Sequence, residues 1–170
     1  GNGTLISLED ESMENTLVSG IAFQKDQVKF TLHSVGDTPG TAFKILGPIS
    51  DAEIEVDVIV QNVSIDDKTD FTFTVSNEDK ELVKKILEDI KAEVEYKEVI
   101  INSEIAKVSL VGAGMRSQAG AASRAFRALS ENDVNIQIIC TSEIKITMVI
   151  DEILVDKAVN VLHKEFELEK

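Results

Sequence analysis

PGTAFKILGPISDAEIEVDVI, residues 39–59, returns 80 residues later as AGAASRAFRALSENDVNIQII, residues 119–139. The hairpin after this stretch is five residues shorter in the second copy, so that FTFTV at 71–75 aligns with ITMVI at 146–150. Repetition over this length indicates two copies of one small fold. Each copy would have about 75 residues, a size at which a lone hydrophobic core is marginal. We therefore expect the copies to pack on each other or on a second chain.

Composition narrows the class of protein. The 170 residues carry a net charge of −14, which disfavours nucleic acid and anionic membranes as partners, because both require a positive face. A hydrophobic content of 43% excludes a disordered chain. The single cysteine, Cys140, lies in an apolar strand pattern and is expected to be a buried thiol in a reducing, cytoplasmic compartment. The two histidines, His33 and His163, lack ligand spacing, so no metal site is predicted.

The first copy has the pattern of an α+β module. Period-two alternation predicts strands, and helical spacing of apolar residues predicts two helices between them. Asp37 precedes the first helix in the turn Gly-Asp-Thr-Pro-Gly and is a candidate helix cap. The order is β-α-β-β-α-β, with strands at 27–35, 54–60, 71–75 and 94–99 and helices at 41–51 and 77–90.

The second copy has the same order of elements but stops before a final strand. Its elements are a strand at 106–111, a turn at 112–114, a helix at 118–129, strands at 134–140 and 143–150, and a helix at 155–166. The apolar strand at 17–24 belongs to neither copy and can fill the missing place. The first module would then be inserted into the second. The predicted domains are 28–100, and 17–27 with 101–170; residues 1–16 form a linker or tail.

Several long runs resemble the tandem ACT domains of aspartate kinase. DTPGTA at 37–42, DVIVQNV at 57–63 and DFTFTV at 70–75 resemble the first ACT domain. AKVSLVGAGMRS at 106–117 and NIQIICTSEIKI at 135–146 resemble the second. GTLI at 3–6 resembles the end of a kinase domain, which suggests a C-terminal fragment of a single-chain enzyme, with a separate regulatory subunit as the other option. The resemblance implies two ferredoxin-like βαββαβ domains.

The resemblance also implies a regulatory function. In this family lysine, threonine or both inhibit the phosphorylation of aspartate, and ATP and magnesium belong to a kinase domain that is missing here. The chain is therefore expected to bind an amino-acid effector, to contain no catalytic site and no cofactor, to form a homodimer through its ACT domains, and to act on a kinase domain or catalytic subunit. The alternatives are a freestanding ACT-type sensor or co-regulator, and an enzyme of ferredoxin-like fold, for which no nucleophile with a nearby base is visible.

An effector site is predicted at the turn before the first helix. Unpaired N–H groups at a helix start, together with the helix dipole, favour a carboxylate there, although such turns are also ordinary connections. By resemblance, the pocket lies between the first module of one chain and the second module of its partner. One side would supply Asp37, Thr38, Pro39, Gly40, Ala42 and Gln61, and the other Asn135 and Ile136.

A second, pseudo-symmetric site would use the corresponding positions of the repeat. Its residues would be Met115, Arg116, Ser117, Gln118, Gly120 and Ala122, facing Glu55 and Val56. Here Glu55 takes the place of Asn135, and a carboxylate there would repel an effector carboxylate but attract a lysine ammonium. The pair Gly112 and Gly114 also matches part of a dinucleotide fingerprint, but Ser117 replaces its third glycine.

Overall fold

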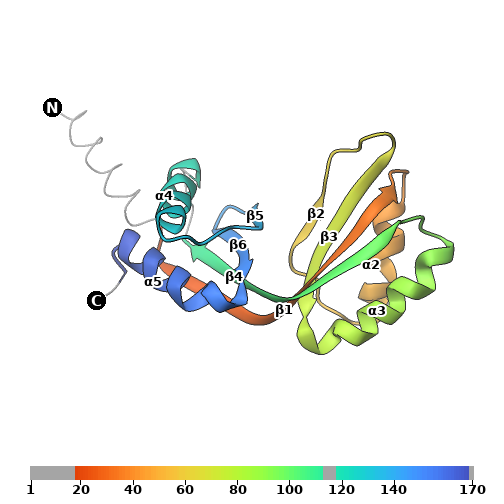
Figure 1. The fold of residues 1–170 in the computed structure, drawn as a ribbon, viewed down its shortest axis with the longest axis horizontal. Coiled ribbons are helices and arrows are strands. Elements are labelled where there is room, and N and C mark those ends of the chain that lie inside the picture. Colours follow the sequence, from red (N-terminus) through yellow and green to blue (C-terminus); the bar gives the residue numbers. More distant parts are fainter. Residues whose placement is uncertain (1–17, 113–117, 169–170) are drawn as a thin grey trace. The chain divides into compact units, whose positions relative to one another are not determined.

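The computed structural model describes residues 18–112 and 118–168. The contacts divide the chain into two compact units (Figure 1). One unit is Asp26–Ile105, and the other combines the residues up to Lys25 with those from Ala106 onward. Two strands, β1 (Gly20–Gly36) and β4 (Glu98–Val111), contribute residues to both units. Each unit is therefore described with its own part of these strands.

The 26–105 unit is a four-stranded sheet covered on one face by two helices. Its sheet order is β2-β3-β1-β4, the order of a ferredoxin-like βαββαβ fold. β3 pairs antiparallel with both β1 and β2. In chain order, the elements between β1 and β4 are α2 (Thr41–Asp51), β2 (Ile59–Gln61), β3 (Lys68–Ser76), the 3-10 turn η1 (Asn77–Asp79), α3 (Lys80–Asp89) and the 3-10 turn η2 (Ile90–Ala92).

The core of this unit reflects strand alternation. Val28, Phe30 and Leu32 of β1 are fully buried, and so are the facing side chains of β3. The rings of Phe30 and Phe73 stack with their centroids 5.5 Å apart, which adds to the free energy gained from burial. α2 closes the core with Ile45 and Ile49. The sheet and the start of α2 are thereby fixed in place.

The other unit repeats the plan. Its elements are α4 (Gln118–Glu131), β5 (Ile138–Thr141), β6 (Lys145–Asp151), η3 (Glu152–Leu154) and α5 (Val155–Glu165), together with β4 from Ala106 onward. The sheet order β1-β4-β6-β5 places the first part of β1 at the position of the last strand. There the Ser19 N–H donates to the Val111 carbonyl at 2.7 Å. Both units thus have the ferredoxin-like strand order.

The structure corrects several expected strand boundaries. The strands expected at 17–24 and 27–35 form the single strand β1, in which Asp26 takes a φ of 58°. Those expected at 94–99 and 106–111 are likewise replaced by β4. The strand expected at 54–60 shrinks to β2. Just before β2 the pairing with β3 is irregular: the Asp57 N–H donates to the Thr74 carbonyl, and the Val58 N–H donates to the Thr74 hydroxyl.

The expected strand at 134–140 becomes β5, which begins at Ile138. Alternation of apolar residues reports which side chains face the core and carries no information on backbone pairing, so it overestimates the length of an edge strand. Within the described ranges, no helix is both long enough and apolar enough to span a bilayer.

Candidate effector-binding site

The predicted turn joins β1 to α2 and is built around Gly40. Gly40 is the N-cap of α2 and has a φ of 90°, a conformation that glycine adopts without a steric penalty. No side chain caps this helix, so the expectation that Asp37 does so is wrong. Instead the Thr41 hydroxyl donates to the Gly36 carbonyl at 3.0 Å and stabilises the turn from inside the helix.

The structure brings Asp37 and Gln61 together. The Gln61 amide nitrogen donates to the Asp37 carboxylate at 3.4 Å, and both side chains are exposed. The Asp37 N–H donates to the Asp67 carbonyl of the β2–β3 hairpin at 2.9 Å, which holds the turn against that hairpin. Thr38, Pro39 and Ala42 are exposed beside them. One end of the unit therefore presents a carboxylate, an amide and a helix start to solvent.

The other half of the predicted pocket lies in the other unit. Asn135 and Ile136 stand between α4 and β5; Asn135 is exposed, and Ile136 packs against the core of its unit. Both line a surface hollow with Phe126, Ser130, Asp133, Val134 and Ile139. Their meeting with the Asp37 turn of a partner chain stays a prediction.

The second predicted site is described only in part. Met115, Arg116 and Ser117 lie outside the described residues, as does Gly114 of the partial dinucleotide fingerprint, and of Gln118 only the backbone at the start of α4 is described. In α4, Gly120 is exposed and Ala122 packs against the core. Glu55 is exposed, while Val56 packs against the core of the 26–105 unit. The role of these residues stays a prediction.

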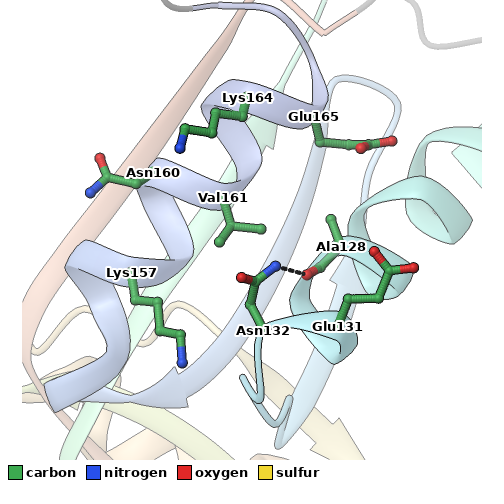
Figure 2. A pocket seen from close by; sticks show the side chains of 8 residues that line it. All are labelled: Ala128, Glu131, Asn132, Lys157, Asn160, Val161, Lys164 and Glu165. Atoms are coloured by element: carbon green, nitrogen blue, oxygen red, sulfur yellow. Dashed lines mark hydrogen bonds between the residues drawn. The ribbon is translucent and has the colours of Figure 1, made fainter.

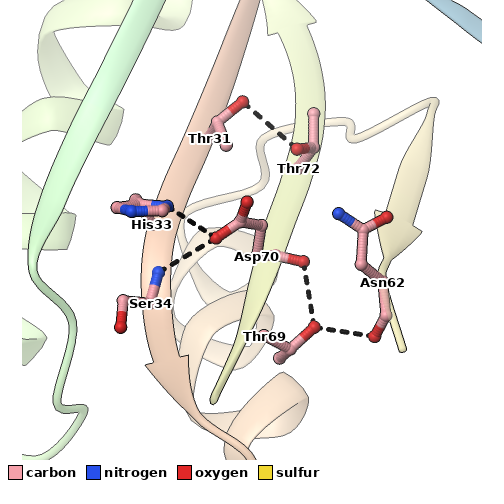
Figure 3. Close-up of polar contacts among 7 residues, drawn as sticks. All are labelled: Thr31, His33, Ser34, Asn62, Thr69, Asp70 and Thr72. Atoms are coloured by element: carbon pink, nitrogen blue, oxygen red, sulfur yellow. Dashed lines mark hydrogen bonds and ion pairs between the residues drawn. The ribbon is translucent and has the colours of Figure 1, made fainter. Parts of the chain in front are cut away.

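A polar cluster that sequence reasoning missed lies at the end of β1 (Figure 3). The Asp70 carboxylate accepts a hydrogen bond from the Ser34 N–H at 3.0 Å and another from the His33 ring at 2.8 Å. The Ser34 hydrogen bond lowers the pKa of Asp70, with a further contribution from His33. The sequence signal was the three-residue step between the inward-facing Leu32 and Val35, which breaks the alternation of the strand.

Two further features lie away from the predicted site. A hollow between α4 and α5 contains Lys157, Lys164 and Glu131, and none of the predicted effector residues lines it (Figure 2). The single cysteine, Cys140, is a half-buried thiol in β5, so it is less buried than expected. Among the described residues, no group of three or more His, Cys, Asp or Glu side chains could hold a metal ion.

Two ACT domains account for both units. Residues 32–95 match one family model described as an ACT domain, and residues 108–166 match another. The ferredoxin-like strand order of both units, the internal sequence repeat and the two family matches together define a tandem ACT protein.

The relatives of the chain include several aspartate kinases. The chain is 55% identical over 170 residues to an aspartate kinase of Pseudomonas fluorescens (strain SBW25), with 99% of the chain covered, and 41% identical to an aspartokinase of Helicobacter pylori (strain ATCC 700392 / 26695). It spans 41% and 42% of the length of these two relatives.

Solved structures similar to this chain also come from aspartate kinases. A structure of aspartokinase alpha and beta subunits contains a chain 44% identical to this one, with a TM-score of 0.82 over 88% of this chain and 99% of that chain. The ligand-free regulatory subunit of aspartate kinase from Thermus thermophilus is 31% identical, with a TM-score of 0.83 and the same coverage. The chain belongs to the aspartate kinase family and consists of the tandem ACT domains of its regulatory region. This finding favours the kinase interpretation over a freestanding sensor.

Proposed function

We propose that this chain is the effector-binding region through which lysine, threonine or both inhibit the phosphorylation of aspartate by the attached or associated kinase. The observation that carries the proposal is the turn at residues 36–40, where Gly40 starts α2 and Gln61 contacts Asp37 at 3.4 Å. The helix start suits an amino-acid carboxylate, and the carboxylate of Asp37 suits its ammonium.

The proposed pocket is shared between two copies of the chain. β2 and β5 are the edge strands, and each exposes an isoleucine at the same position of the repeat, Ile59 at 48% and Ile139 at 47%. Exposed apolar edges favour pairing with another chain, and a two-fold dimer is the commonest closed assembly. A dimer would bring the Asp37 turn of one chain to Asn135 of its partner. Sedimentation showing only monomer at micromolar concentration, with and without effector, would contradict this arrangement.

Calorimetric titration tests the proposed effector. L-lysine and L-threonine would be titrated separately and together into the protein, with L-methionine as a control amino acid. We expect heat of binding from lysine, threonine or the pair, and none from methionine. Gln61→Ala should weaken that binding, whereas Gln24→Ala, which removes an exposed glutamine of β1, should not. No binding of either effector at millimolar concentration would refute the proposal.

A further inference from the structure

The end of β1 contains a bulge in which two residues stand opposite one. Leu32 pairs with Phe71 and Val35 pairs with Thr69, so His33 and Ser34 together stand opposite Asp70. Ser34 has a φ of 57°, which is unusual for a residue with a side chain. A bulge of this kind bends a strand and redirects the chain beyond it. Beyond this bulge, β1 leads directly into the turn that carries Asp37.

A single oxygen atom holds both residues of the bulge. Oδ1 of Asp70 accepts from the Ser34 N–H at 3.0 Å and from the His33 Nδ1–H at 2.8 Å (Figure 3). Hydrogen bonds to a charged acceptor are stronger than those between neutral groups. The Asp70 carboxylate therefore offsets the cost of the unusual Ser34 backbone conformation at the place where that cost arises.

The same short segment of β3 also holds the strand that carries Gln61. The Asp70 carbonyl accepts from the Asn62 N–H at 3.2 Å, and the Thr69 hydroxyl donates to the Asn62 carbonyl at 2.7 Å. Residues 69–70 thus connect to both sides of the Asp37–Gln61 contact. In the second copy of the repeat, Lys145 occupies the position of Asp70, so that copy has no carboxylate there.

We propose that Asp70 is a positioning residue for the effector site: by binding both residues of the β1 bulge, its carboxylate sets the direction in which the chain enters the Asp37 turn. The inference rests on the proposed function, because the affected site is the effector site. Asp70 contacts neither Asp37 nor Gln61 through its side chain and acts through the backbone of β1.

The test compares Asp70→Ala with the more conservative Asp70→Asn, which keeps an acceptor oxygen. The matched control is Glu81→Ala, which removes another carboxylate of the same unit, one that forms an ion pair with Lys84 in α3 at 3.6 Å. Each variant would be titrated with L-lysine and L-threonine. We expect Asp70→Ala to weaken effector binding about tenfold, which is near the lower end for loss of a charged hydrogen bond, Asp70→Asn to weaken it less, and Glu81→Ala to leave it unchanged.

Hydrogen exchange on the effector-free protein separates positioning from a merely local effect. In Asp70→Ala we expect faster exchange at the Asp37 and Thr41 amides, which lie beyond the bulge, and unchanged exchange in α3. If the wild type binds effector and both Asp70 variants bind as tightly, the inference is wrong while the proposed function stands. If Asp70→Ala does not fold, unchanged affinity and exchange in Asp70→Asn overturn the inference. If the wild type binds neither amino acid, the proposed function fails, and exchange alone decides the role of Asp70.

Discussion

Gly40 is the residue whose backbone most constrains the predicted site. Its φ of 90° is strained for any residue with a Cβ, while an added Cβ would meet no atom within 4 Å. Gly40→Ala should therefore lower the free energy of unfolding by roughly 1–2 kcal/mol through the backbone alone. Urea titration measures this loss. Gly20→Ala is the matched control, because Gly20 has equal space and no positive φ. Equal effects of the two substitutions would contradict the argument.

Asp70 should make the free energy of unfolding depend on pH in the acidic range. Its pKa lies below the usual 3.8, mainly because the Ser34 N–H donates to it. A carboxylate with a lowered folded-state pKa stabilises the protein above its unfolded-state pKa, and this contribution is lost as the pH falls through the folded-state pKa. The wild type should therefore be more stable than Asp70→Asn near pH 6, and the difference should shrink as the pH falls below about 4. Urea midpoints measured at several pH values test this, and a constant difference would refute it.

At the scale of the element, residue spacing in α2 determines which side chains of the helix are buried. Ile45 is fully buried, whereas Phe43, two residues earlier, is 79% exposed, because two residues turn a helix by about 200°. Ile45→Ala should cost about 2–5 kcal/mol of stability, and Phe43→Ala should change it by less than about 0.5 kcal/mol. Thermal or urea unfolding would measure both. A large loss for Phe43→Ala would mean that another surface covers that side chain.

Much of the architecture could be predicted from apolar periodicity and the repeat. The helix at 41–51 and the βαββαβ order were visible in side-chain spacing, because burial imposes that spacing. Strand continuity could not be predicted, because the polar pair Lys25 and Asp26 separates two apolar strand patterns although β1 runs through it. At the site, the turn could be recognised from its residues. Gln61 was placed beside Asp37 only through the family resemblance, because their contact depends on pairing between β2 and β3. The contacts of Asp70 with the bulge required the partner strand to be known.

At the scale of the whole molecule, a pocket shared between two chains makes a distinctive prediction. Asn135→Ala and Asp37→Ala should each abolish or weaken effector binding alone, by about 1.5–3 kcal/mol for a hydrogen bond to a charged group. In a heterodimer of the two variants, one pocket carries both defects and the other is intact. Calorimetry on the exchanged mixture should therefore show binding return in the heterodimers, at one pocket of each pair. Binding no better than in either variant, after confirmed exchange, would mean that each pocket lies within one chain.

The use of β1 by both units means that one core depends on residues that precede the other unit in the chain. Val18 and Ile21 pack into the core of one unit, Val28 and Phe30 into the core of the other, and residues 22–26 between them are exposed. A chain shortened to begin at residue 26 would keep every core side chain of the 26–105 unit. It would remove Val18, Ile21 and an outer strand from the other unit. Shortening the chain from this end should therefore destabilise the unit that contains the C-terminal half of the sequence, although the residues removed lie at the opposite end of the chain.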